Sequence, residues 1–171
     1  MNLKVASNLT FDSIVDGPGL RMVLWTQGCV HGCKGCHNQK TWDVNGGEIM
    51  DTKDIIASIK SSNLQTGLTI SGGEPFLQPT PILEIVKAIA KTSLSIWIYT
   101  GYMYEQLQNN PKFVEILKYI DVLVDGKFEV DKQDYNVLFC GSSNQRLIDI
   151  KKTKEMNKIV LWKSDYTIEI E

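Results

Sequence analysis

Three closely spaced cysteines are the residues of this sequence best suited to chemistry. Cys29, Cys33 and Cys36 lie in the run Gly-Cys-Val-His-Gly-Cys-Lys-Gly-Cys-His-Asn, which covers residues 28–38. Thiolates are the usual ligands of iron–sulfur clusters, and such a cluster normally takes four of them. A loop that supplies only three leaves one iron free to bind a substrate rather than only to pass electrons. This spacing therefore predicts an open iron–sulfur site.

Two other interpretations of the cysteines stay open. A structural zinc site needs four protein ligands, and His31, His37 and the distant Cys140 are the candidates to complete it. Zinc sites usually combine two close ligands with a second close pair, which this sequence lacks. The second alternative is that the cysteines only pack or respond to redox conditions. A disulfide scaffold is disfavoured, because the chain is long for a stapled small domain and carries no secretory signal.

The length and charge of the chain limit its class. With 171 residues, of which 43% are apolar, we expect a single domain over residues 1–171. Its 18 basic and 20 acidic residues give a net charge of −2, so we expect no nucleic-acid partner. No apolar stretch reaches the length of a membrane span, and the N-terminus lacks a targeting pattern. We therefore expect a cytoplasmic protein without a membrane partner, in which thiols stay reduced.

Strands and helices are expected to alternate along the chain. Apolar or alternating runs predict strands at residues 21–26, 67–70, 95–99, 122–124, 159–162 and 166–171. Three helices are expected between them: one over residues 51–61 with Thr52 as N-cap, one opened by Thr80-Pro81, and one starting at Asn110-Pro111. Apolar residues recur at helical spacing in the last two, at Ile82, Ile85, Val86 and Ile89 and at Phe113, Ile116, Leu117 and Ile120.

This alternation predicts an α/β fold with a mainly parallel sheet covered by helices. A closed eight-fold barrel typically needs about 250 residues, so we expect an open, partial (β/α) barrel. In such folds the loops that follow the strands meet at one rim. Four polar segments follow the first four strands: the cysteine loop, Ser71–Pro75, Thr100–Tyr102 and Asp125–Lys127. Their positions predict one shared site.

Each of these segments also has a purely structural interpretation. Gly72 and Gly73 form an ordinary strand-to-loop turn, or they let the backbone come close to a ligand. Asp125 and Lys127 are a solvated turn pair, or a carboxylate and an ammonium that position a charged ligand. In the run Asp16-Gly17-Pro18-Gly19, a type II turn is favoured.

The cysteine loop and the Gly-Gly-Glu-Pro segment together resemble those of the radical S-adenosylmethionine superfamily. The closer resemblance is to the family of activating proteins of the anaerobic ribonucleoside-triphosphate reductase. It is carried by residues 16–21, 28–38, 41–42, 71–75, 97–102, 121–128 and 141–148. The last two segments point to the reductase activators in particular. Cys140 departs from the pattern, because an arginine is expected before Gly-Ser-Ser-Asn-Gln.

The resemblance implies a cofactor site. Cys29, Cys33 and Cys36 would hold a 4Fe-4S cluster, whose fourth iron would be chelated by the amino and carboxylate groups of S-adenosyl-L-methionine. The other residues that would serve the cofactor are Gly72 and Gly73, through backbone carbonyl groups, Glu74, which would support that strand end, and Gly35, Cys36 and His37, beside the adenosyl portion. Asp125 and Lys127 would lie where related activators meet the cofactor or the glycyl loop of the partner.

The resemblance also implies an oxidoreductase activity. Reductive cleavage of S-adenosylmethionine would give methionine and a 5′-deoxyadenosyl radical, which would take a hydrogen atom from a glycine of the large, glycyl-radical subunit of the anaerobic ribonucleotide reductase. A donor such as flavodoxin or ferredoxin would supply the electron.

Two rival functions stay open. One is activation of another glycyl-radical enzyme such as pyruvate formate-lyase, whose activators tend to be longer and lack the 141–148 segment. The other is a zinc-binding interaction module that is not an enzyme.

Overall fold

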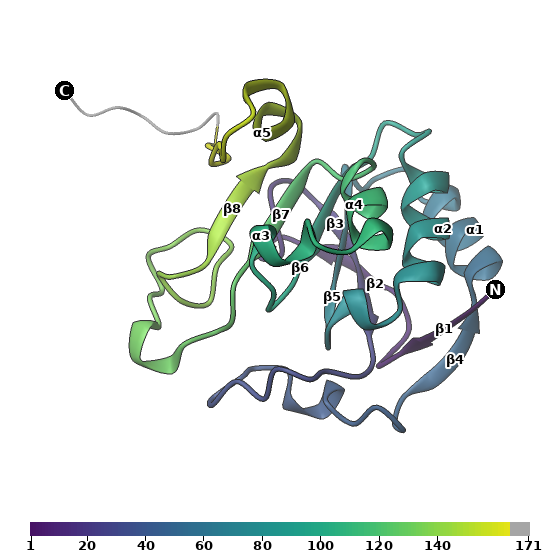
Figure 1. Ribbon diagram of the computed structural model, residues 1–171. Coiled ribbons are helices and arrows are strands. Elements are labelled where there is room, and N and C mark those ends of the chain that lie inside the picture. Colours follow the sequence, from purple (N-terminus) through teal and green to yellow (C-terminus); the bar gives the residue numbers. More distant parts are fainter. Residues whose placement is uncertain (165–171) are drawn as a thin grey trace.

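An eight-stranded mixed sheet forms the centre of the fold (Figure 1). The computed structural model describes residues 1–164. Its strands are β1 Asn2–Val5, β2 Thr10–Ser13, β3 Arg21–Thr26, β4 Glu48–Asp51, β5 Gly67–Gly72, β6 Ser95–Tyr99, β7 Val122–Asp125 and β8 Arg146–Asp149. They pair in the order β4-β1-β3-β5-β6-β7-β8, and β2 also pairs with β3.

The middle of the sheet consists of the four parallel strands β3, β5, β6 and β7. Nearly every residue of these strands is buried. Strands that are covered on both faces have continuous apolar sequences, so the sequence predicted all four of them. The outer strands pair antiparallel, which makes the sheet mixed. The expected α/β class is confirmed, while the curvature of a partial barrel stays a prediction.

Helices pack against this sheet and close the core. Figure 1 shows α1 (Thr52–Ser61), α2 (Pro79–Ile89) and α4 (Pro111–Leu117) on the same side of the sheet, with α2 between the other two. The predicted apolar face of α2 is fully buried. Shorter helices complete the fold: α3 Tyr104–Leu107, α5 Ile150–Met156 and the 3-10 helices η1 Gln39–Thr41, η2 Pro75–Leu77 and η3 Val130–Lys132. Within residues 1–164, no helix is long and apolar enough to cross a membrane.

Two predicted helix starts are wrong by one residue each. The N-cap of α1 is Asp51, not Thr52, because the Asp51 carboxylate accepts a hydrogen bond from the Lys53 backbone N–H at 2.8 Å. The Thr52 hydroxyl instead donates to Met1 O, which fastens the helix to the N-terminus. Helix α2 begins at Pro79 rather than at Thr80. Pro79 and Pro81 both lie in the first turn of α2, where the backbone N–H groups have no acceptor within the helix.

The predictions for the C-terminal part were less accurate. Helix α4 ends at Leu117, although Ile120 is buried as its apolar spacing suggested. Residues 159–162 do not form the predicted strand: Leu161 makes one isolated antiparallel bridge with Ile148. The strand predicted at residues 166–171 lies outside the described residues. Strands β1, β2, β4 and β8 were missed, since short strands of mixed polarity lack the apolar run that revealed the inner strands.

The Asp16–Arg21 segment has a structural role at the start of β3. Arg21 is fully buried, and its guanidinium donates to Thr69, Ser95 and three backbone carbonyl groups. A Cβ atom on Gly17 would lie 2.8 Å from Arg21 Cδ, so this glycine makes room for the side chain. Gly19 has a φ of +76°, which fits the second central position of the predicted type II turn. The motif thus encloses a buried cation with neutral acceptors.

Candidate metal centre

The cysteine loop leaves β3 and is held at its start by the chain that follows it. Gly28 N donates to Thr41 O at 2.7 Å, and Cys29 N donates to Trp42 O at 3.1 Å. Helix η1 thereby folds back against the first cysteine. A further turn within the loop is closed by Cys36 N, which donates to Cys33 O at 3.1 Å. These backbone bonds define the path of the loop without using any cysteine side chain.

All three cysteines of the loop line one cavity of about 130 Å³. Its walls also include residues at the carboxyl ends of β5, β6 and β7, namely Ser71, Gly72, Gly73, Tyr99, Thr100, Gly101, Gly126 and Phe128. The predicted convergence of the four loops is therefore confirmed. It follows from the parallel pairing of β3, β5, β6 and β7, which brings their carboxyl ends to the same edge of the sheet.

The cavity disfavours free thiolates. Burial raises the pKa of Cys29, a hydrogen bond from the His31 backbone N–H opposes this rise, and the negative charges of Glu74, Cys33 and Cys36 add to it. Burial likewise raises the pKa of Cys33, against a hydrogen bond from the Phe128 backbone and with repulsion from Cys36. A positively charged iron centre would reverse this balance, because a bound cation deprotonates a coordinating thiol.

The donor set fits an iron–sulfur cluster. All four cysteines are free, and the three in the loop are partly exposed around the same cavity. Within residues 1–164, no three histidine, cysteine or acidic side chains lie close enough together to hold a single metal ion. A four-iron cluster is wider than one ion and takes its thiolates at separate corners. Three cysteines around one cavity fit the separate corners of such a cluster.

The candidates for a fourth zinc ligand have other partners. His31 Nε2 lies 2.6 Å from Glu74 Oε2. The ring of His37 packs on Phe128 with their centroids 5.2 Å apart. Cys140 packs with Trp97, Val122 and Val124, and burial raises the pKa of its thiol to about 12. Neither His37 nor Cys140 lines the cysteine cavity.

The Gly72-Gly73 segment touches the end of β3 directly. Gly73 N donates to Thr26 O at 2.8 Å, and a Cβ atom on Gly73 would lie 2.2 Å from Gly28 O. A Cβ atom on Gly72, whose φ is +103°, would lie 2.5 Å from Thr26 O. The absence of side chains at these two glycines lets the backbone of the chain itself pass close by, while their approach to a ligand stays a prediction. Their backbone lies in the cavity wall beside the first cysteine.

Glu74 lies behind the cavity wall and is fully buried. Its carboxylate accepts hydrogen bonds from the Phe76 and Gly101 backbone N–H groups and from the Thr100 hydroxyl, all between 2.9 and 3.0 Å. With His31 it thus joins the ends of β5 and β6 to the cysteine loop. This position suits the expected support of a strand end and gives the carboxylate no surface in the cavity.

Asp125 and Lys127 are not partners. The buried Asp125 carboxylate pairs with Arg146, at 2.9 Å from Nε and 2.5 Å from Nη2, and also accepts from Tyr104 N. Both of its oxygens are therefore occupied by the protein. Lys127 is exposed at the rim, and its positive charge opposes the rise that burial causes in the pKa of Cys33. Of the two residues, only Lys127 presents its side chain to solvent.

Sequence reasoning missed two polar residues of this rim. Gln145 lines the cavity, donates to Gly126 O at 3.0 Å and accepts from Gly141 N at 2.9 Å. Arg146 holds Asp125 as described. Both belong to the 141–148 segment that the resemblance singled out, but local sequence gives no sign of contacts with a strand about twenty residues earlier.

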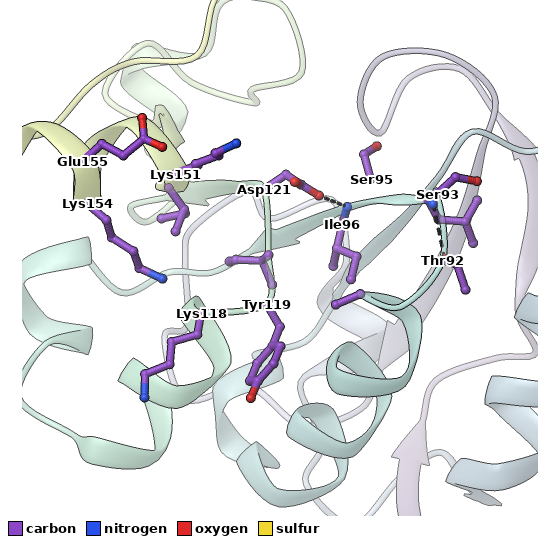
Figure 2. Close-up of a pocket in the computed structure, with 14 residues that line it drawn as sticks. Thr92, Ser93, Ser95, Ile96, Lys118, Tyr119, Asp121, Lys151, Lys154 and Glu155 are labelled. Carbon is purple, nitrogen blue, oxygen red and sulfur yellow. Dashed lines mark hydrogen bonds between the residues drawn. The ribbon is translucent and has the colours of Figure 1, made fainter.

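A second cavity lies at the opposite, amino-terminal ends of β6 and β7 (Figure 2). It has a volume of about 610 Å³ and none of the predicted site residues line it. Figure 2 shows the Asp121 carboxylate accepting a hydrogen bond from Ile96 N, at 2.7 Å. Lys118 and Lys154 border the cavity, and the Lys154 ammonium donates to Leu117 O. These bonds join the segment before β7 to the start of β6, and α5 to the end of α4.

Comparisons with known proteins agree with this geometry. Residues 15–148 match the family described as a 4Fe-4S single cluster domain. The chain is 40% identical over 140 residues to the anaerobic ribonucleoside-triphosphate reductase-activating protein of Enterobacteria phage T4, covering 78% of this chain and 86% of that protein. It is 38% identical over 141 residues to the protein of the same name from Escherichia coli K12, covering 77% and 90%. The crystal structure of QueE from Escherichia coli has a related fold, with a TM-score of 0.50 and 19% identity over 59% of this chain and 53% of that one.

Proposed function

The chain belongs to the 4Fe-4S single cluster domain family and to the family of anaerobic ribonucleoside-triphosphate reductase-activating proteins, and from that premise we propose that it is the radical S-adenosylmethionine activase of such a reductase. The observation that carries this proposal is the convergence of Cys29, Cys33 and Cys36 on one cavity at the carboxyl edge of the parallel strands. Three thiolates provide an open iron, and the neighbouring backbone provides a wall for the ligand of that iron.

A bound cluster would supply one electron to the sulfonium of S-adenosylmethionine, which breaks a carbon–sulfur bond and yields methionine and a 5′-deoxyadenosyl radical. The radical would take one hydrogen atom from a glycine of the large reductase subunit and leave as 5′-deoxyadenosine. The glycyl radical then remains on the partner. A donor such as flavodoxin or ferredoxin would provide the electron.

The residues of this chain would bind and orient. Cys29, Cys33 and Cys36 would be the iron ligands, and the backbone of Gly72 and Gly73 would meet the methionyl group. Gly35, Cys36 and His37 would lie beside the adenosyl group, where His37 packs on Phe128. Orientation is the main task, because homolysis needs no general acid or base.

Three further residues would act at or behind the rim. Glu74 would hold the ends of β5 and β6 without touching the cofactor, since it is fully buried. Asp125 would hold Arg146 and the start of α3. Lys127 would be the residue that meets the cofactor or the glycyl segment of the partner, because it is exposed beside the cavity.

The test is a paired assay under anaerobic conditions with reconstituted protein, S-adenosylmethionine and a chemical reductant. We expect 5′-deoxyadenosine to appear and a glycyl radical to form on the large reductase subunit, counted by electron paramagnetic resonance. Pyruvate formate-lyase is the matched alternative substrate. A radical on that enzyme and none on the reductase would assign a different partner. If the isolated protein contained zinc but neither iron nor sulfide, the proposed enzymatic activity would be wrong.

A further inference from the structure

His31 connects the cysteine loop to a buried carboxylate. It lies between Cys29 and Cys33 in the sequence, yet its side chain is only 7% exposed. Its Nε2 atom is 2.6 Å from Glu74 Oε2, and Glu74 itself has no exposed surface. The imidazole of His31 therefore bonds to a buried protein group, although it belongs to the loop that carries the three cysteines.

Within residues 1–164, the other hydrogen bonds to the Glu74 carboxylate come from the chain that follows β5 and β6. The donors are Phe76 N, Gly101 N and the Thr100 hydroxyl. Within residues 1–164, His31 is the one donor to this carboxylate that belongs to the cysteine loop. The pair therefore joins that loop to the two strands that form the opposite wall of the cavity.

The surroundings fix the imidazole in place. The ring of Tyr102 meets it edge to face, with centroids 4.6 Å apart. A Cβ atom on Gly101 would lie only 2.4 Å from His31 Cδ2, so a glycine is required for the imidazole to reach Glu74. A ring held by a hydrogen bond, an aromatic contact and a steric fit has little freedom to rotate.

The same contact places His31 beside the cysteines. His31 lies two residues after Cys29 and two before Cys33, and it lines the cavity together with them. Loss of the His31–Glu74 bond would free the middle of the loop to move and would change the hydrogen bonding and solvent exposure of the cluster sulfurs. Hydrogen bonds to the sulfurs are among the factors that set the reduction potential of an iron–sulfur cluster.

We propose that His31 is a positioning residue, whose bond to Glu74 holds the cysteine loop against the opposite wall of the cavity so that the cluster keeps its reduction potential. This inference rests on the proposed function, because it presupposes a cluster on the three cysteines. It assigns His31 no contact with iron or with S-adenosylmethionine.

The test compares four variants with the wild-type protein. His31→Ala removes the donor to Glu74, and His31→Gln replaces it with an amide donor of similar reach. Gly101→Ala keeps every donor but pushes the imidazole aside. Val30→Ala is the matched control, because this neighbouring side chain is 60% exposed. Iron and sulfide content, thermal unfolding and the midpoint potential of the cluster, from a mediated titration followed by electron paramagnetic resonance, are measured for each.

We expect His31→Ala and Gly101→Ala to shift the midpoint potential and the resonance line shape beyond any change in Val30→Ala. His31→Gln should return both toward the wild-type values. If His31→Ala assembles no cluster, restored assembly in His31→Gln supports the proposal, and failure in both variants overturns it. Midpoint potentials equal to that of Val30→Ala, with or without a lower unfolding temperature, also overturn it.

The wild-type protein separates this inference from the proposed function. If the wild-type chain binds no iron and sulfide, the proposed function itself fails. If the wild-type chain binds a cluster, and His31→Ala and Gly101→Ala keep the wild-type midpoint potential, only the role proposed for His31 is wrong.

Discussion

The guanidinium of Arg146 holds the carboxylate of Asp125, with Nε 2.9 Å from Oδ1 and Nη2 2.5 Å from Oδ2. Asp125 is fully buried, while the Arg146 side chain is 26% exposed and also bonds Glu105. The pairing raises the pKa of Arg146, chiefly through the hydrogen bond with Asp125. It links the last residue of β7 to the first residue of β8 across an antiparallel register pair. Asp125 is therefore explained by the fold before any ligand is considered.

Asp125→Asn should act mainly by lowering the stability of the fold. The variant removes a charge-assisted bond to Arg146, so we expect a loss of roughly 1.5–3 kcal/mol in the free energy of unfolding. Glu105→Gln is the matched control, because it weakens an exposed bond to the same arginine and should cost less than about 1 kcal/mol. Denaturant unfolding measures both. Equal losses in the two variants would contradict the structural role of Asp125.

Lys127→Met should separate cofactor cleavage from radical transfer. Lys127 is exposed, so stability should change by less than about 0.5 kcal/mol. If its ammonium guides the glycyl segment, 5′-deoxyadenosine release should persist while radical formation on the reductase falls, because small misplacements of reacting atoms greatly reduce rates. Lys112→Met, at an exposed lysine of α4, is the control. A parallel loss of both products would place Lys127 in the cofactor site.

Each cysteine of the loop should be required for the cluster. Reconstituted wild-type protein should contain about four irons and four sulfides per chain, as a cubane cluster requires. Alanine at Cys29, Cys33 or Cys36 should abolish this content. Cys140→Ala should keep it, because Cys140 packs beside Trp97 outside the cysteine cavity. Iron and sulfide analysis decides, and lost iron in Cys140→Ala would refute the ligand assignment.

Gly73→Val should disturb the cysteine loop as well as the cofactor wall. Its Cβ atom would overlap Gly28 O, one residue before the first cysteine, so we expect lower cluster content and a lower unfolding temperature. Gly32→Ala is the control within the loop: a Cβ atom there meets nothing within 4 Å, and its φ of +59° costs about 1–2 kcal/mol. An intact cluster with weaker S-adenosylmethionine binding in Gly73→Val would instead support a role limited to the ligand.

The cluster-free protein should lose stability as the pH rises above about 9. Burial raises the pKa of Cys140 from 9.0 to about 12 in the folded state. As the pH rises, the thiol therefore loses its proton in the unfolded chain before it does so in the folded protein. The contribution of Cys140 to the free energy of unfolding is complete below pH 9 and falls by up to about 1.4 kcal/mol per pH unit above it. Cys140→Ala should flatten this decline between pH 8 and pH 10. An unchanged slope in unfolding experiments would show that Cys140 titrates normally.

Local sequence patterns were enough to predict the strands, helices and motifs that are determined by residues close to one another in the sequence. The three cysteines are close because their spacing is short, whatever the rest of the fold does. Residues 21–26 and 95–99 form strands with the predicted bounds, since continuous apolar runs suit strands buried on both faces. The apolar face of α2 follows from helical periodicity alone. From these elements the meeting of four loops at one edge could also be inferred, because parallel strands align their carboxyl ends.

Only the tertiary structure decided which polar groups are partners. Asp125 is two residues from Lys127 in the sequence, yet it pairs with Arg146 on the next strand. Glu74 receives His31 from a loop 43 residues earlier. Gly73 is a glycine because the backbone of Gly28 passes 2.2 Å from where its Cβ atom would lie. Such contacts depend on strand register and loop paths, which are set by packing across the whole sheet and leave no periodic signal in the residues that make them.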